Sequence, residues 1–230
     1  MPTLTRSADA PDVFLLHLGD GENRFSPDWV AEVGAALDEV VATPEPRALV
    51  TTASGKTWSQ GLDLAWLGEN PDGFAGYVDS VHALLARVVA LPVPCVAAVQ
   101  GHCYAAGAMI ALAHDQRVMR SDRGYFCLPE VDIRIPFTPG MSALIAARLT
   151  PAVAHEAMTT GQRYGGAAAA AAGLVDVAVP EEELLAVAVA RAQELAGKHG
   201  PTLGAIKEEL YERALGKLRS SALGSTSLPG

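Results

Sequence analysis

The feature of this sequence that most constrains its fold is a regular alternation of apolar, strand-like runs with helical patterns. Seven predicted elements follow one another with short connections: strand 13–18, helix 27–41, strand 47–52, a helical piece 62–67, helix 74–91, strand 95–100 and helix 105–114. This order is typical of a layered α/β domain with a mostly parallel sheet. Two more short strands are predicted at 117–119 and 125–128, and the chain from 142 onward has mostly helical patterns.

Turn and capping residues mark the ends of these elements. Ser26 and Pro27 are suited to the cap and first position of the helix that follows, and Pro92 ends the long helix before the strand at 95–100. The alanine run at 167–172 is predicted to form a short packed helix, because alanine is the best helix former. We find no linker-like segment that would divide the chain.

Composition and charge exclude several classes of protein. The chain has 230 residues, of which 50% are hydrophobic and 19% charged, which is typical of a soluble globular domain. A net charge of -9 argues against a nucleic-acid partner, because such proteins usually carry a basic surface. The apolar window 93–113 is interrupted by Pro94, Gln100 and His102, so it is predicted to be core and not a membrane span.

Location and metal binding are predicted from what the sequence lacks. The first thirty residues are acidic and have no long apolar run, so no signal peptide is predicted. The three cysteines lie among apolar neighbours and are predicted to be reduced, and the Leu-Pro-Gly end is not a peroxisomal address, so we predict a cytoplasmic protein. The scattered histidines do not have the spacing of zinc ligands, so no metal site is predicted.

Two segments share one local design. In both 58–64 (WSQGLDL) and 100–107 (QGHCYAAG), a strand ends, a tight turn follows and a helix is predicted to begin, at about Leu62 and near Ala106. The first amides of a helix lack intrahelical acceptors, so two such ends brought together would form an oxyanion hole, worth roughly 3 kcal/mol per donor. Taken singly, each segment is better explained as an ordinary strand-to-helix turn.

Four segments in order resemble the crotonase (enoyl-CoA hydratase/isomerase) superfamily. They are WSQGLDL, VAAVQGHCYAAGAMIALAHD, LPEVDIRIPFTPG and TGQRYGGAAAAAAGLVD, and the resemblance covers about residues 13 to 211. The stretches GLDLAW, ALAHDQRVMRSDRG and PEVDI are most similar to plant-type Δ3,Δ2-enoyl-CoA isomerases. The resemblance implies a spiral of ββα units over residues 1–195, followed by a helical segment at 196–230 that packs or forms trimers.

The resemblance also assigns the catalytic positions. Leu62 and Ala106 fall where the family places its two oxyanion-hole amides. Many relatives have two glycines where this sequence has Ala105 and Ala106, which is acceptable if neither needs a positive φ. The second family acid matches Glu130, whereas Met109 replaces the first acid and cannot transfer protons. A single carboxylate suits a double-bond shift, in which it moves a proton from C2 to C4.

The remaining expectations concern the surroundings of Glu130 and the substrate. Met109, Pro136 and Phe137 are expected to form an apolar pocket that raises the pKa of Glu130. Asp132 is the second choice of acid. Without the resemblance, Glu130 reads as a surface acid after a proline. The positions expected to border the thioester or its coenzyme A are Arg24, Lys56, Ser59, Gly61, Asp63 and Leu64.

Some of these assignments have plainer alternatives. Arg24 and Lys56 are equally well solvated surface charges, and Asp63 can simply cap the helix that follows it. Three functions are kept open: an enoyl-CoA isomerase, another crotonase reaction (hydration, acyl-CoA hydrolysis or decarboxylation), and a non-catalytic acyl-CoA-binding member. Coenzyme A is part of the substrate, so no separate cofactor is expected. The family resemblance implies a homotrimer or hexamer. An apolar stripe forms either a subunit interface or internal core: Leu184, Leu185, Val187, Val189 and Leu195.

Overall fold

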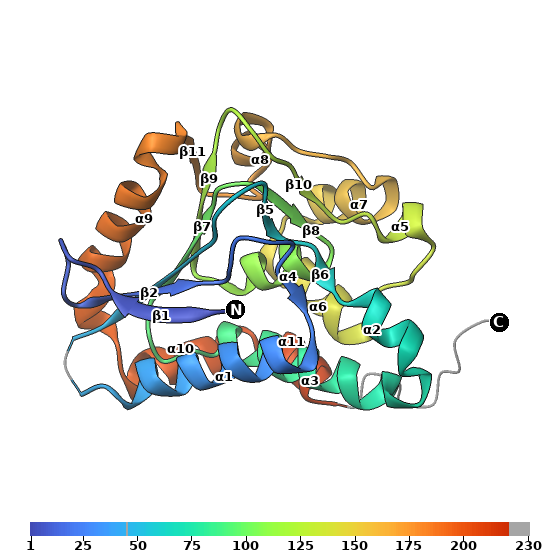
Figure 1. Cartoon of the computed structure of the whole chain (residues 1–230), viewed down its shortest axis with the longest axis horizontal. Helices are drawn as coiled ribbons and strands as arrows, with labels where there is room; N and C mark the ends of the chain where they lie inside the picture. The colour runs from blue at the N-terminus through green and yellow to red at the C-terminus, as the bar shows by residue number, and fades with distance from the viewer. Residues whose placement is uncertain (45, 221–230) are drawn as a thin grey trace.

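The structure, a computed structural model, describes residues 1–44 and 46–220. A six-stranded sheet with the order β1-β2-β4-β7-β9-β11 forms its centre (Figure 1). β1 is antiparallel to β2, and every other neighbouring pair in this sheet is parallel. The strands span Thr3–Arg6 (β1), Val13–His17 (β2), Ala48–Thr52 (β4), Cys95–Val99 (β7), Gln116–Arg120 (β9) and Val177–Val179 (β11). The predicted α/β architecture with a mostly parallel sheet is confirmed.

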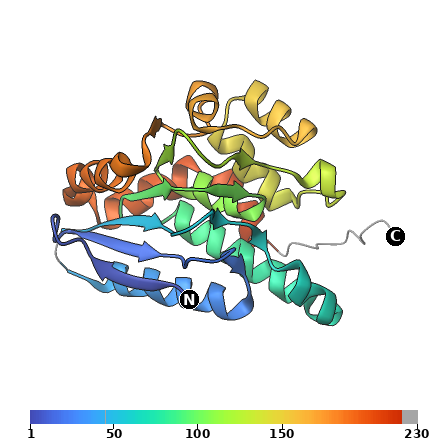
Figure 2. The same ribbon diagram turned by 45° about the horizontal axis from the view of Figure 1, so that its top comes forward.

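The sheet is buried on both faces because its strands are apolar at successive positions. In β7, Val96 and Ala98 point to one face, and Cys95, Ala97 and Val99 point to the other. The first face is covered by α9 and the second by the main core with α1, α3 and α4. Figure 2 shows α9 in orange and α1 in blue on opposite sides of the sheet. Burial on both faces is typical of parallel sheets and explains the continuous apolar runs.

Shorter strands build a second layer beside the main sheet. β5 (Thr57–Ser59), β8 (His102–Tyr104) and β10 (Phe126–Cys127) form a parallel three-stranded sheet, and β3 (Arg24–Phe25) pairs with β6 (Gly61–Leu62). Each strand from β2 to β9 in the main sheet is therefore followed by a strand of the second layer and then by a helix. This repetition is the predicted spiral of ββα units.

The helices surround these layers, and several of them begin at a side-chain cap. Ser26 and Thr138 each accept a hydrogen bond from the backbone amide three residues later, at 3.2 Å in both cases. The helices that contact the site or the sheet include α1 (Pro27–Ala42), α2 (Leu64–Glu69), α3 (Phe74–Val89), α4 (Ala106–Ala113), α5 (Glu130–Ile133), α6 (Pro139–Arg148), α8 (Gly166–Ala172) and α9 (Glu181–Leu195). Further helices are α7 (Pro151–Thr160), α10 (Pro201–Leu210) and α11 (Glu212–Arg219).

Two local predictions are corrected by the structure. Residues 53–60, the connection between the predicted strand 47–52 and the helical piece 62–67, contain β5, which pairs with β8 some 45 residues away in sequence. A helix was expected to begin at about Leu62, but Leu62 ends β6 and α2 begins at Leu64. In both places, pairing with a strand distant in sequence sets the local structure, and no local pattern reveals it.

The C-terminal helices pack on the rest of the chain. In the predicted apolar stripe, Leu184 is buried against the main sheet and Val187 and Val189 are partly buried there, whereas Leu185 is 43% exposed. α11 packs against α3 and α6. Residues 221–230 of the predicted C-terminal segment lie outside the described residues, and its role in trimer assembly stays a prediction.

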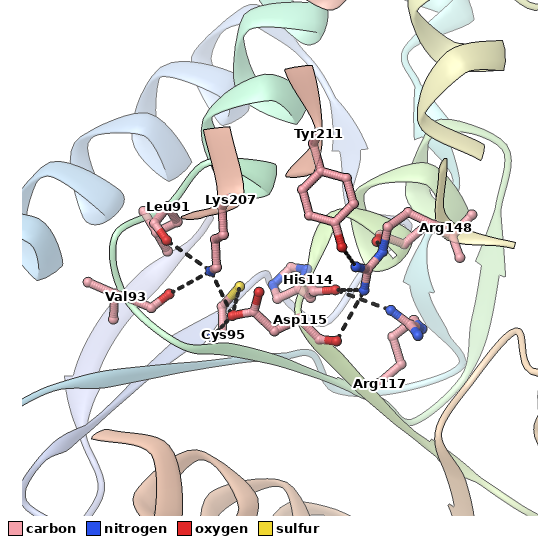
Figure 3. Close-up of polar contacts among 10 residues, drawn as sticks. Leu91, Val93, Cys95, His114, Asp115, Arg117, Arg148, Lys207 and Tyr211 are labelled. Carbon is pink, nitrogen blue, oxygen red and sulfur yellow. Dashed lines mark hydrogen bonds and ion pairs between the residues drawn. The ribbon is translucent and has the colours of Figure 1, made fainter. Parts of the chain in front are cut away.

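A buried polar network closes the C-terminal end of α4. The ammonium of Lys207 donates to Leu91 O at 2.9 Å and Val93 O at 3.3 Å and pairs with the Asp115 carboxylate at 2.7 Å (Figure 3). The Asp115 carboxylate also accepts the backbone amide of Cys95 at 2.8 Å. This network joins α10 to the end of α4 and to the start of β7.

Arg148 of α6 extends the same network. Its guanidinium donates to the carbonyl oxygens of Leu112 and His114 at 2.7 and 2.6 Å and to the hydroxyl of Tyr211 (Figure 3). The last carbonyls of a helix have no intrahelical donor, and Arg148 supplies it here. The network therefore ties α6 and the C-terminal helices to α4.

Three negative findings apply to the part of the chain that the structure describes. Cys95, Cys103 and Cys127 are buried and form no disulfide. No helix within residues 1–44 and 46–220 is long and apolar enough to cross a membrane. In the same residues, no group of three or more His, Cys, Asp or Glu side chains is placed to hold a metal ion.

Candidate active site

The fold brings the two turn segments against each other. A Cβ atom added to Gly61 would lie 2.6 Å from the amide nitrogen of Ala106 and 2.9 Å from that of Gly107. Gly61 also has a φ of +78°, a backbone angle that residues with a side chain rarely adopt. Glycine is therefore required here on two grounds, and its absent side chain lets β6 approach the first turn of α4.

The turn before Gly61 is held from behind by Ser59 and Asn23. The Ser59 hydroxyl accepts the Gly61 amide at 3.0 Å and donates to Asn23 O at 2.8 Å, and the Asn23 side-chain amide donates to Trp58 O at 3.0 Å. Ser59 is fully buried and does not line the cavity described below. The expectation that Ser59 contacts substrate is therefore wrong: its hydroxyl is used to shape the turn.

Ala105 adopts a conformation that favours glycine. Its φ is +51° and its ψ is -128°, and its amide donates to Cys127 O at 3.1 Å. A residue with a side chain in such a region typically costs about 1–3 kcal/mol. Alanine was expected to be acceptable here only if the position needs no positive φ. The structure does not meet this condition, so the N-terminus of α4 carries local strain.

Asp63 has a structural role in the neighbouring turn. Its carboxylate accepts the Trp66 amide at 3.1 Å and caps α2, and its own amide donates to the Tyr77 hydroxyl at 2.9 Å. That hydroxyl in turn donates to Phe25 O at 2.7 Å, and burial raises the pKa of Tyr77 to about 12. Asp63 does not line the cavity, so its role is to cap the helix, which was the plainer of its two predicted roles. Tyr77 was not identified from the sequence.

A cavity of about 260 Å³ opens beside these two turns. Leu62 and Ala106 both line it, together with Glu130. Its deepest walls are almost fully buried and apolar, with Met109 at 1%, Val78 at 2% and Met141 at 4% exposure. The full lining is Arg24, Gln60, Leu62, Leu64, Leu67, Phe74, Val78, Tyr104, Ala105, Ala106, Met109, Pro129, Glu130, Ile133, Ile135, Pro136, Thr138 and Met141.

Glu130 places a buried carboxyl in this apolar cavity. It is the first residue of α5 and is 6% exposed, and its Oε2 atom is buried without a hydrogen-bond partner in the described residues. Burial raises the pKa of Glu130 to about 7. A carboxyl with such a pKa is half-ionised near neutral pH and can both accept and release a proton.

The other predicted pocket residues divide into two groups. Pro136, Leu64 and Met109 line the cavity as expected. Phe137 packs against the main core and does not line the cavity, so its expected place in the pocket is not found. Asp132 is exposed and also lies outside the cavity, so the second choice of acid is not placed for catalysis.

A second, more polar cavity adjoins the first. It measures about 390 Å³ and shares Gln60 and Tyr104 with the apolar cavity. Lys56 lines it, and Lys56, Arg123 and Arg163 add to burial in lowering the pKa of His102. Asp20 and Glu22 also line this cavity, so its lining is of mixed charge, and Lys56 is the lining side chain that can pair with an anionic ligand.

Arg24 lies at the apolar cavity and forms an ion pair with Glu22 at 2.8 Å. Part of its charge is therefore already balanced.

Several lining residues were not identified from the sequence. Phe74 and Val78 belong to the apolar face of the predicted helix 74–91, and the pattern gave no reason to distinguish cavity wall from core. Thr138 and Met141 sit at the start of α6, which was predicted only as part of a helical region. These residues share the same cavity as Glu130, and this proximity exists only in the folded chain.

Comparisons with known proteins agree with this geometry. A profile of the family described as enoyl-CoA hydratase/isomerase matches residues 13–222. Enoyl-CoA delta isomerase 2, peroxisomal, of Arabidopsis thaliana is 37% identical over 90% of this chain and 92% of its own. Enoyl-CoA delta isomerase 3 of the same plant is 36% identical over 87% and 89%.

Solved structures agree as well. An apo enoyl-CoA isomerase from Mycobacterium tuberculosis superposes with a TM-score of 0.86 at 26% identity, covering 97% of this chain and 96% of its own. The family match spans most of the chain and includes both turn segments and Glu130. The chain therefore belongs to the enoyl-CoA hydratase/isomerase, or crotonase, family.

Proposed function

We propose that this protein is a Δ3,Δ2-enoyl-CoA isomerase, which converts 3-enoyl-CoA thioesters to 2-enoyl-CoA thioesters. The observation that carries the proposal is the isolation of Glu130. It is the one carboxyl among the residues that line the apolar cavity, and Met109 lies in the same cavity. One proton-transferring group beside two candidate amide donors supports a double-bond shift. The names of the two plant relatives support the same reaction.

The chemistry needs a single group that moves one proton. The ionised Glu130 takes a proton from C2, and the electrons of that C–H bond form a dienolate whose negative charge rests on the thioester oxygen. The amides of Leu62 and Ala106 are proposed to donate to that oxygen, in an environment where little water competes. Glu130 then returns the proton to C4, which leaves the double bond between C2 and C3 and restores the carboxylate.

The two cavities divide the thioester between them in this proposal. The acyl chain lies in the apolar cavity with Glu130. The phosphates of coenzyme A extend toward the more polar cavity, where Lys56 can pair with them, and Arg24 offers a second charge. Coenzyme A belongs to the substrate, and the proposed chemistry requires no separate cofactor.

Hydration is the main competing reaction. It requires a water molecule held and activated by two acids in this family, and the thioether of Met109 cannot accept or donate a proton. Acyl-CoA hydrolysis, decarboxylation and non-catalytic binding are further outcomes that an assay distinguishes. We also propose a homotrimeric or hexameric, cytoplasmic protein. Sedimentation velocity tests the assembly, and a fluorescent fusion tests the location.

The experiment is a spectrophotometric assay of trans-3-hexenoyl-CoA with wild type and Glu130→Gln, run beside 2-hexenoyl-CoA hydration. We expect conversion to the 2-enoyl product, a loss of about 100-fold or more in kcat/KM for Glu130→Gln, and little hydration. The control variant is Asp132→Asn, which removes an exposed acid two residues away and should retain activity. If folded wild type converts neither substrate, the isomerase proposal fails.

A further inference from the structure

The hydroxyl group of Tyr77 joins two backbone segments beside the proposed amide donors. Tyr77 belongs to α3 and is 4% exposed. Its hydroxyl donates to Phe25 O at 2.7 Å and accepts a hydrogen bond from the amide of Asp63 at 2.9 Å. Asp63 directly follows Leu62, whose amide is one of the two proposed donors. We call this pair of hydrogen bonds the Tyr77 bridge.

The Tyr77 bridge lies where the pairing of two short strands ends. β3 and β6 are parallel and have two residues each, and their last paired residues are Phe25 and Leu62. Beyond this pair, the amide of Asp63 is connected to the carbonyl of Phe25 through the Tyr77 hydroxyl. The hydroxyl therefore extends the connection between the two segments by one residue.

The two proposed amide donors differ in how firmly their surroundings are packed. Every residue of α4, which begins with the donor Ala106, is buried. Leu62 is only partly buried, and the helix that follows it, α2, has no buried residue. Tyr77 itself belongs to the main core. The Tyr77 bridge thus fixes the more loosely packed donor segment to a firmly packed helix.

We infer that Tyr77 is a positioning residue for the oxyanion hole: its hydroxyl fixes the peptide unit after Leu62 and so holds the Leu62 amide toward the thioester oxygen. The inference rests on the proposed function, in which that amide donates to this oxygen. Preorganised donors stabilise the charge that develops in the transition state more than they stabilise the bound substrate. A small displacement of the Leu62 amide should therefore lower kcat and leave KM almost unchanged.

Tyr77→Phe tests this role, because it removes the Tyr77 bridge but keeps the ring, whose centroid lies 5.2 Å from that of Trp66. We expect kcat for trans-3-hexenoyl-CoA to fall by about tenfold and KM to change by less than about twofold. The matched control is Tyr211→Phe. It removes a hydroxyl that is hydrogen-bonded to Arg148 and does not line the cavity, so kcat should stay at the wild-type value.

Infrared spectroscopy separates positioning from a general loss of stability and requires no turnover. The probe is hexanoyl-CoA labelled with ¹³C at its carbonyl. Hydrogen bonds from the oxyanion hole lower the carbonyl stretching frequency, so the probe should absorb at lower frequency when bound to wild type than when free in solution. Tyr77→Phe should reverse part of this shift, and Tyr211→Phe should retain all of it. A role confined to stability would change the urea midpoint of Tyr77→Phe but not the carbonyl frequency.

A second pair of variants removes the Tyr77 bridge from its other end. Asp63→Pro and Asp63→Ala both lose the side-chain cap of α2, but only proline also lacks the amide that Tyr77 accepts. The φ of Asp63 is -82°, which is close to the value that proline imposes. Relative to Asp63→Ala, Asp63→Pro should show the fall in kcat and the partial reversal of the carbonyl shift.

The carbonyl frequency decides the positioning role, and turnover decides the proposed reaction. An unshifted carbonyl in wild type, or the full wild-type shift in Tyr77→Phe, would overturn the positioning role whether or not kcat falls. An equal fall of kcat in Tyr211→Phe, or identical behaviour of Asp63→Pro and Asp63→Ala, would overturn it as well. A carbonyl shift that depends on Tyr77, in a protein that does not isomerise 3-hexenoyl-CoA, would support the positioning role and defeat the isomerase proposal.

Discussion

The buried charged groups at the two ends of α4 differ in their hydrogen-bond partners. At the C-terminal end, the Lys207 ammonium is bonded to two carbonyl oxygens and one carboxylate. At the N-terminal end, Glu130 faces the cavity with one carboxyl oxygen buried and unpaired in the described structure. Each group is less than 10% exposed.

The difference explains what each end does. A buried charge with partners on every side fixes the elements that carry those partners, here α4, α10 and β7. A buried carboxyl without a partner is held less stably in its charged form, and this raises its pKa into the range useful for proton transfer. The helix is thus anchored at one end and reactive at the other.

The largest effect on stability is expected from removing the ammonium at the anchored end. Lys207→Met should lower the free energy of unfolding by about 3 kcal/mol, because it leaves the Asp115 carboxylate and two carbonyl oxygens without their donor. Urea denaturation measures this. The double variant Lys207→Met/Asp115→Asn should recover part of the loss, and a loss of the same size in both variants would show that the pair is not coupled.

The reactive end should respond to pH instead. The folded-state pKa of Glu130, about 7, is above its ordinary value of 4.5, so the folded protein retains a proton that the unfolded chain releases between these values. Stability from this group is therefore present at low pH and falls as pH rises toward 7. Glu130→Gln should be more stable than wild type by about 2 kcal/mol at pH 8, and this difference should disappear near pH 4.5. A pH-independent difference in urea midpoints would contradict the assignment.

A smaller effect is expected from the strain next to the reactive end. Ala105→Gly should raise the free energy of unfolding by about 1 kcal/mol, since glycine relieves the cost of the positive φ but loses more entropy on folding. Thermal unfolding measures the change. As a control, Ala113→Gly, within the helical part of α4, should destabilise the protein. Loss of stability in Ala105→Gly would mean that the backbone at this position is not strained.

The smallest effect is expected at a surface ion pair. Arg219 and Glu208 are 2.6 Å apart but both side chains are largely solvated, at 51% and 44% exposure. Arg219→Ala should change the free energy of unfolding by no more than about 0.5 kcal/mol, because water screens the exposed pair. If urea denaturation showed a loss of unfolding free energy as large as that of Lys207→Met, the distinction between buried and exposed ion pairs would not hold.

Features set by neighbouring residues or by family motifs could be predicted from the sequence of this molecule. Glycine, proline and capping residues mark element ends locally, so Ser26, Pro92 and Gly61 located the turns correctly. The family motifs located Glu130, and its burial followed from apolar neighbours such as Met109. These features depend on residues close in sequence or on a pattern shared with relatives.

The missed features depend on partners far away in the chain. Lys207 meets Asp115 across 92 positions, and nothing near either residue indicates the pair. The positive φ of Ala105 accompanies a bond from its amide to Cys127, and the buried position of Ser59 follows from its bond to Asn23. Such contacts exist only after the strands have paired, so they appear in the structure and not in the sequence.

The most direct test of the account is the pH dependence of kcat/KM for isomerisation of trans-3-hexenoyl-CoA, measured from about pH 5 to about pH 8. The base must be ionised to take the C2 proton, and the pKa of Glu130 is about 7. The account predicts that kcat/KM rises with pH, reaches half of its maximum near pH 7 and then levels off, with this dependence absent from the residual activity of Glu130→Gln. A wild-type profile that is flat over this range, or half-maximal near pH 4.5, would contradict it.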